Sequence, residues 1–326
     1  MSGTGRFLLR RLAQAVPTVL LILVINFAVL HAAPGDAADV LAGEAGSATP
    51  EYLAALRERY GLDQPLPVQL GRYVLNTLRF DLGFSPRYGV PVSQLILGRL
   101  PATLLLMAVS LTLAFLVGIA LGVTAARNVG RPADGLISVL ALLCYATPTF
   151  WIGLMMIVLF GVRLQWLPTG GMTDLSAGHT GLAAAWDVAR HAVMPAAALS
   201  LFYVAIATRL MRASMLEAYG ADWVRTARAK GLDEGRIATR HVLRNALLPI
   251  VTVTGLQVGS VLGGAVLVET VFAWPGLGRL AYEAVFQRDF NLLMGILVAS
   301  SLLVILVNIA VDLLYTVIDP RIELRR

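Results

Sequence analysis

Charge is scarce in this sequence, and long stretches have none. Only 14% of the 326 residues are charged, whereas 57% are hydrophobic. About 20 apolar residues in a helix cross the hydrocarbon core of a bilayer, and lipid offers no partners to backbone groups outside a helix. A soluble domain is therefore excluded, and the sequence predicts an all-α integral membrane protein with six transmembrane helices. The six blocks without Asp, Glu, Lys or Arg contain 18 to 28 residues each: Leu12–Gly35, Leu100–Ala126, Gly135–Val162, His191–Thr208, Asn245–Val268 and Phe290–Val311.

Cysteine and lysine occur once each. Cys144 has no partner for an intramolecular disulfide, and it falls inside the third block. Lys230 is followed by Gly231, so the Gly-Lys-Ser/Thr of a phosphate-binding loop is absent. The four histidines are scattered, and neither His-Glu-x-x-His nor Gly-x-Ser-x-Gly occurs. We therefore expect no catalytic, metal or cofactor site in this chain.

The predicted spans also lack charge at their centres, where a charged side chain usually has a function. The nearest is Asp312, close to the inner end of the last block. A proton-driven carrier is disfavoured, because such carriers depend on intramembrane ionisable groups. A self-sufficient channel or carrier and an intramembrane enzyme remain as alternatives. The favoured interpretation is a membrane path that takes its energy from a separate protein.

The basic residues predict the orientation. With the N-terminus in the cytoplasm, sixteen of the 26 basic residues fall on the cytoplasmic side, as the positive-inside rule requires. Both termini are then cytoplasmic, residues 1–35 hold the first span, and residues 36–98 are extracytoplasmic. The pI of 9.8 follows from this topology and does not indicate nucleic-acid binding. Arg10 and Arg11 before an apolar run also fit a cleaved signal peptide, although the run is long for one.

The extracytoplasmic segment 36–98 is too short for a catalytic domain and is predicted to cover the outer mouth. In "TPEYLAALRERYG", Thr49 is the expected N-cap, Pro50 takes the first helical position and Gly61 ends the helix. A second, amphipathic helix is expected from about Val68. Its apolar face should carry Leu70, Val74 and Leu78.

The cytoplasmic loop 212–247 carries much of the charge of the C-terminal half. "EAYGADWVRTARAK" predicts a short helix that ends at Gly231, and Asp233 can cap a second helix with Glu234 near its N-terminus. Basic residues at positions 236, 240 and 244 form a stripe that would suit lipid phosphates. The small side chains of the first helix instead suit a groove on another protein. The residues assigned to this docking element are Ala221, Asp222, Arg225, Thr226, Ala227, Arg228, Lys230 and Gly231.

Glycines recur at every fourth position in two of the blocks. Gly118 and Gly122 do so in the second block, and small residues at this spacing let helix backbones approach closely. The fifth block has three such glycines, which would pack either within one bundle or against a second transmembrane subunit beside the path. The residues assigned to this packing and to the path are Gly255, Gln257, Gly259, Ser260 and Gly263.

Motifs along nearly the whole chain resemble the permease subunits of binding-protein-dependent ABC importers of the dipeptide, oligopeptide and nickel type. Taken together and in this order, the motifs are highly specific. They are "PGD", "YGLDQPLPVQ", "DLGFS", "RLPATLLL", "TPTFWIGLMMIVLFG", "LPTGG", "MPAAALSL", "TRLMRASMLEAYGADWVRTARAKGL", "RHVLRNALLPIV", "VETVFAWPGLGRL" and "NIAVDLLYTVIDPRI".

The resemblance implies a permease core over residues 99–326 and a location in a bacterial inner membrane. It also implies a second homologous permease, an extracytoplasmic binding protein, and two cytoplasmic ATPases that bind ATP and magnesium in place of this chain. In the family, the loop with "TARAKG" couples to the ATPase. Ala227 and Gly231 match the general Glu-Ala-Ala…Gly pattern, but Arg225 stands where that pattern has glutamate. Peptides are the implied substrate, with nickel chelates, glutathione and oligosaccharides as alternatives.

Overall fold

The structure is a computed structural model that describes residues 3–32, 49–60 and 62–318. Most of these residues are helical. Contacts divide the described chain into two compact units, and each is described by itself. The first takes in the residues up to Pro101 together with Arg279–Leu313, and the second takes in Ala102–Gly278 and residues 314–318.

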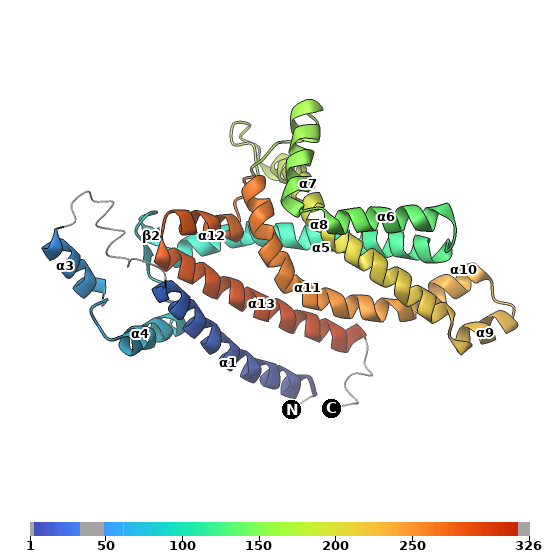
Figure 1. Ribbon diagram of the computed structural model, residues 1–326, viewed down its shortest axis with the longest axis horizontal. Coiled ribbons are helices and arrows are strands. Elements are labelled where there is room, and N and C mark those ends of the chain that lie inside the picture. The colour runs from blue at the N-terminus through green and yellow to red at the C-terminus, as the bar shows by residue number, and fades with distance from the viewer. Residues whose placement is uncertain (1–2, 33–48, 61, 319–326) are drawn as a thin grey trace. The chain divides into compact units, whose positions relative to one another are not determined.

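The first unit contains the N-terminal helix, the described residues that follow it up to Pro101, and most of the last two helices (Figure 1). Its two short strands pair antiparallel, with Phe84 opposite Pro91. The side chain of Ser85 donates a hydrogen bond to the Asp289 carboxylate, which also caps the last helix by accepting from the Leu292 N–H at 3.1 Å. The elements are α1 (Gly3–Ala32), α3 (Pro50–Tyr60), α4 (Leu66–Leu78), β1 (Phe84–Ser85), β2 (Val90–Pro91), the start of α5 (Val92–Arg127), α12 (Leu277–Phe286) and α13 (Phe290–Ile318).

Local sequence signals account for the helices α3 and α4. Thr49 caps α3, since its Oγ1 accepts from the Tyr52 N–H at 3.3 Å, as the sequence predicts. The predicted stop at Gly61 lies outside the described residues. α4 begins at Leu66, close to the predicted start. The apolar face of α4 differs from the prediction, because Leu78 is 60% exposed.

The second unit is organised around α8, which packs against α6, α7 and α11 (Figure 1). The glycine pair of α5 allows that helix to lie close to α8. A Cβ on Gly118 would come within 2.6 Å of the Ala207 Cβ, and one on Gly122 within 2.5 Å of the Met211 Cβ. Close packing predicted from this pair is therefore confirmed. The elements are α6 (Pro132–Ala146), α7 (Thr149–Met156), η1 (Ile157–Arg163), α8 (Gly181–Tyr219), α9 (Asp222–Ala229), α10 (Glu234–Arg236), η2 (Ile237–Val242) and α11 (Leu243–Val271).

The third predicted span is not one straight helix. α6 and the α7–η1 helix meet at a bend of 102° around Thr147 and Pro148. Proline cannot donate to the preceding turn and disfavours the helical conformation of the residue before it. Thr147 is accordingly extended, with φ −84° and ψ 129°. The sequence "TPT" is the local signal for this break, and the prediction of one helix across Gly135–Val162 was wrong.

The predicted count of six spans is matched only in part. Within the described residues, α5, α8 and part of α13 are long and apolar enough to cross a membrane, and the bent α6–α7 pair makes a fourth candidate. The apolar parts found in α1 and α11, at Ala13–Val29 and Gly259–Val271, are shorter. The described chain is therefore mostly helical with three or four candidate membrane spans, and the number six remains a prediction.

Candidate functional site

The predicted docking helix forms as α9. The long helix α8 ends at Tyr219, Gly220 follows, and the extended residue Ala221 leads into Asp222–Ala229. Asp222 lies in the first turn, where a negative charge favours the helix dipole. Gly231 has φ +73°, and a Cβ there would meet nothing within 4 Å. The glycine is therefore required by its backbone conformation and not by crowding.

One face of α9 packs onto the rest of its own chain. Val224 is fully buried and Ala227 is 6% exposed. They belong to an apolar cluster, named here the α9 cluster. Its buried members are Ala126 of α5, Met211 and Met215 of α8, Val224 and Ala227, Ile237 and Val242 of η2, and Ala246 and Ile250 of α11. The small side chain of Ala227 therefore fits against this chain, and its role in docking stays a prediction.

The opposite face of α9 is exposed and charged. Of the residues assigned to docking, those with exposed side chains are Asp222, Arg225, Thr226, Arg228 and Lys230. Trp223 lies among them with 39% of its surface exposed, and the sequence analysis missed it. A lone aromatic residue between small and charged ones was the available signal, since tryptophan is enriched where proteins bind one another.

An ion pair ties α9 to α10 across Gly231. Arg228 donates from Nε to Glu234 Oε1 at 2.6 Å and from Nη2 to Oε2 at 3.3 Å. The hydrogen bonds from Arg228 hold the pKa of the Glu234 carboxyl below its usual range and raise that of the guanidinium. Asp233 caps α10 as predicted, accepting from the Gly235 N–H at 2.8 Å. The turn after α9 is therefore held by local contacts on both sides.

A second ion pair connects α8 to α6. Arg212, seven residues before the end of α8, donates to both Asp134 carboxylate oxygens, at 2.6 and 2.8 Å. Asp134 lies in the first turn of α6 and is 7% exposed. The α9 cluster and this ion pair join α9 to α8, α11 and α6, so a displacement of α9 can reach three other helices.

The surroundings of three of the residues assigned to the path are described, and they differ. Gln257 lines a small cavity of about 20 Å³ with Tyr203 of α8 and Leu111 of α5. Ser260 is exposed, and a Cβ on Gly263 would meet nothing within 4 Å. Contacts of Gly259 and the surroundings of Gly255 lie outside what the structure describes. Of the three glycines of the fifth predicted span, Gly263 is the one whose contacts are described. It makes no close contact within this chain.

Three motifs that carried the family resemblance meet in the second unit. The Gly171 N–H of "LPTGG" donates to the carbonyl of Phe272, in "VETVFAWPGLGRL", at 2.8 Å. The fully buried Glu269 of the same motif accepts from Thr103 Oγ1 of "RLPATLLL" at 2.7 Å, and that hydroxyl accepts from the Leu277 N–H, also at 2.7 Å. The sequence did not indicate the contacts of Thr103, because it lies more than 160 residues from Glu269 and Leu277.

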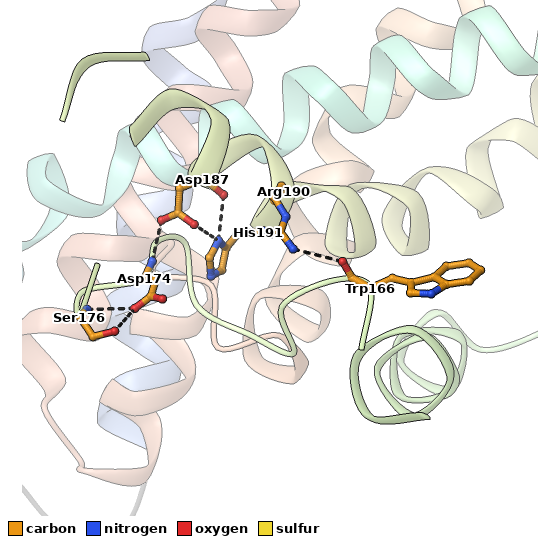
Figure 2. A network of polar contacts seen from close by, with 6 residues as sticks. All are labelled: Trp166, Asp174, Ser176, Asp187, Arg190 and His191. Carbon is orange, nitrogen blue, oxygen red and sulfur yellow. Dashed lines mark hydrogen bonds and ion pairs between the residues drawn. The ribbon is translucent and has the colours of Figure 1, made fainter. Parts of the chain in front are cut away.

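The loop before α8 is attached to that helix by a polar network (Figure 2). The Asp187 carboxylate accepts from the Asp174 N–H at 2.7 Å and lies 3.2 Å from His191 Nδ1. Ser176 donates to Asp174 from both its N–H and its hydroxyl, which lowers the pKa of that carboxyl. Arg190 donates to the Trp166 carbonyl at 3.2 Å. His191 is thus part of a structural contact.

Known proteins resemble the chain over almost its full length. It is 40% identical to the oligopeptide transport system permease protein AppB of Bacillus subtilis (strain 168), covering 97% of this chain and 99% of that protein. It is 41% identical to the dipeptide transport system permease protein DppB of Escherichia coli (strain K12), covering 98% of each.

Solved structures support the fold. An inward-facing structure of the MetNI methionine ABC transporter contains a chain that matches with a TM-score of 0.55. The match covers 70% of this chain and 97% of that one at 19% identity, which shows a shared fold alone.

Two family models match the chain. The N-terminal model of the membrane component of binding-protein-dependent transport systems covers residues 4–108. The model of the inner membrane component itself covers residues 118–324. The helical fold and the full-length relatives agree with these matches. The chain belongs to the family of inner membrane components of binding-protein-dependent transport systems.

Proposed function

We propose that the chain is one of two permease subunits in an ATP-driven peptide importer and that α9 is the surface on which a cytoplasmic ATPase docks. The two relatives are an oligopeptide and a dipeptide permease, which supports peptides as the substrate class. Nickel chelates, glutathione and oligosaccharides remain alternatives, since selection would lie mainly in the binding protein. ATP and magnesium would be bound by the ATPases, and the absence of a cofactor from this chain stays a prediction.

The two faces of α9 carry this proposal. Its buried face, with Val224 and Ala227, joins it to the chain's own long helices. Its exposed face presents Trp223 with the charged side chains around it. A surface helix that served only its own chain would have no need for an exposed tryptophan in a charged loop. Such a residue is a typical anchor at a protein interface.

The proposed mechanism passes motion inward through these contacts. Closure of two ATPases on ATP would displace α9, and the α9 cluster would pass the displacement to α8 and α11. The Arg212–Asp134 ion pair would carry it on to α6. Packed helices respond to such displacements by discrete shifts, so the path would alternate between outward and inward access.

The proposed topology has six spans and both termini in the cytoplasm. The bent α6–α7 pair would then be one broken span, and α1 and α11 would supply the two spans that are shorter in apolar length. Residues 36–98 would face outward, where the binding protein docks. The exposed positions Ser260 and Gly263 of α11 would face the second permease or the path, and the remaining apolar surfaces would face lipid.

Cross-linking at two adjacent positions tests the docking assignment. In a Cys144→Ser background, Thr226→Cys should cross-link to the ATPase through a photoreactive maleimide, whereas Ala227→Cys should not, because its side chain is buried. Reconstituted complexes should take up peptide only with ATP and all subunits. Peptide uptake by the purified chain alone would support a self-sufficient carrier, and failure of Thr226→Cys to cross-link in every nucleotide state would remove α9 as the docking surface.

A further inference from the structure

A cavity of about 140 Å³ lies in the first unit, between α4, the turn that follows it, and the first two turns of α13. Half of the residues that line it are polar, and each of these carries a side-chain oxygen. Tyr73, Asn76 and Thr77 come from α4, Asp81 from the turn and Asn291 from α13. Asp81 is the one charged residue among the ten that line the cavity, and none of the ten is basic.

The polar groups of the lining have acceptor capacity to spare. Asn291 uses its Nδ2 to donate to the Phe84 carbonyl at 3.0 Å, which leaves the amide oxygen as an acceptor. Asp81 Oδ1 accepts from the Gly83 N–H at 3.1 Å, and a carboxylate offers several further lone pairs. The Tyr73 hydroxyl is buried beside Thr77 and has no hydrogen-bond partner of proper geometry among the described residues.

The rest of the lining is apolar or glycine. Leu82, Met294 and Val298 contribute its apolar side chains. An occupant therefore needs an apolar stem and a hydrogen-bond-donating, positively charged head. Lysine and arginine side chains have this build, with a chain of methylene groups that ends in a cation and donors only.

The size of the cavity favours one side chain over a whole ligand. Pockets for small molecules usually measure about 300–1,000 Å³. A cavity of about 150 Å³ holds a molecule the size of benzene. The present cavity falls in the second class, so a peptide would not fit inside it, whereas a side chain projecting from a docked protein would.

We propose that this cavity receives a lysine or arginine side chain of the binding protein, with Asp81 as its counter-ion. The assignment rests on the proposed function, in which the outer segment faces the binding protein. Tyr73, Thr77 and the amide oxygens of Asn76 and Asn291 complete the set of acceptors around the cation. The contact positions the binding protein on this permease and takes no part in binding the transported molecule.

The test measures the affinity of the complete importer, in nanodiscs, for its substrate-loaded binding protein. Asp81→Asn removes the charge but keeps an oxygen that can accept from Gly83, so the turn should survive. We expect about tenfold weaker binding with a shallower dependence on salt, because a charge pair is lost. Tyr73→Phe should weaken binding less. Asp63→Asn makes the same charge change at an exposed residue of the outer segment outside the cavity and should bind as wild type does.

Uptake by the same preparations separates this assignment from the proposed function. Wild-type uptake together with unchanged affinity in Asp81→Asn would overturn the cavity assignment alone. Equal weakening in Asp81→Asn and Asp63→Asn would overturn it as well, since only the general charge of the segment would matter. If Asp81→Asn instead slowed import of free-amine peptides but not of N-acetylated ones, at unchanged affinity for the binding protein, the cavity would recognise substrate and the assignment would be wrong. Absence of ATP-driven uptake by the wild-type complex would count against the proposed function, while the binding measurement would still decide the cavity.

Discussion

Gly231 and Ala227 show two different reasons for a small residue in the α9 loop. Gly231 lies in open space but has φ +73°, which side chains with a Cβ adopt at a cost. Ala227 has ordinary helical geometry but belongs to the α9 cluster and is 6% exposed. The family pattern makes both positions prominent in the sequence. Only the structure separates a backbone requirement from a packing requirement.

Gly231→Val should uncouple the importer without unfolding it. The left-handed conformation costs a residue with a Cβ roughly 1–2 kcal/mol, and β-branching adds to the strain, so the end of α9 should tilt or fray. We expect normal membrane insertion, a steep fall in uptake, and loss of the ATPase stimulation produced by loaded binding protein. Gly178→Val is the matched control, because Gly178 has φ +57° and equally open surroundings away from α9. Uptake at the wild-type rate by Gly231→Val would contradict the docking role of the loop.

The Arg228–Glu234 pair should be visible in a titration. Arg228 lowers the pKa of the Glu234 carboxyl, so the ionised pair favours the folded turn above the unfolded-state pKa of about 4.3, and that contribution is lost as the pH falls through the lowered value. Carbon-13 NMR of the Glu234 carboxyl should show a pKa below the ordinary range in the wild type. The pKa should return toward that range in Arg228→Gln. Equal values in the two proteins would show that the ion pair does not form in solution.

Among the elements of the candidate site, α9 was the most predictable in its position and its ends. The direction in which each of its faces points could not be predicted. Capping residues at its end and at the start of α10 are local signals, and both acted as predicted. Which face turns inward depends on Met211, Met215 and Ile250 of other helices. The bend at Pro148 had a local signal that apolar length obscured. The buried Glu269–Thr103 contact had none, since nothing in either sequence neighbourhood indicates the other.

Trp223→Ala should weaken the docking of the ATPase. An exposed tryptophan at the centre of an interface often contributes about 2 kcal/mol or more, which corresponds to roughly a 30-fold change in affinity. We expect the detergent-purified permease pair to bind ATPase with that loss, as measured by biolayer interferometry, while its thermal stability stays unchanged. Trp186→Ala serves as control, since Trp186 is 69% exposed near the other end of α8. Equal affinities for the wild type and Trp223→Ala would exclude this anchor.

The two glycine sets should respond differently to added bulk. Gly122→Leu would drive a side chain into Met211 and the Thr208 carbonyl, which lie 2.5 and 2.7 Å from an ideal Cβ. Overpacking of this kind typically costs about 1–3 kcal/mol, so the purified chain should melt at a lower temperature. Gly263→Leu should leave the chain's own melting unchanged but reduce recovery of the second permease. Unchanged recovery would mean that Gly263 faces lipid.

At the scale of the whole molecule, the bent α6–α7 pair allows two topologies in the membrane. A broken span places the turn before α6 and the loop after η1 on opposite sides, whereas a re-entrant pair returns to the side on which it started. Composition predicted the membrane class and most helix positions. It could not distinguish these two topologies, because both bury the same apolar residues in lipid.

Single-cysteine labelling with an impermeant reagent should decide the topology. In a Cys144→Ala background, we expect Asp63→Cys and Ser176→Cys to react in intact cells. Arg131→Cys and Lys230→Cys should react only after permeabilisation; all four side chains are exposed in this chain. Reaction of Arg131→Cys and Ser176→Cys from the same side would identify a re-entrant pair. Labelling of Lys230→Cys from outside would invert the proposed orientation.

The length of α8 has a mechanical consequence. Its 39 residues extend about 58 Å at 1.5 Å per residue, whereas the hydrocarbon core is about 30 Å thick. A helix of this length converts a small rotation into a large displacement of its far end. A tilt of about 5° about one end moves the other end by about 5 Å, close to the 5.4 Å pitch of a helix. Since α9 follows the C-terminal end of α8 after two residues, a nucleotide-driven displacement of a few ångströms there would require only a few degrees of rotation in the membrane.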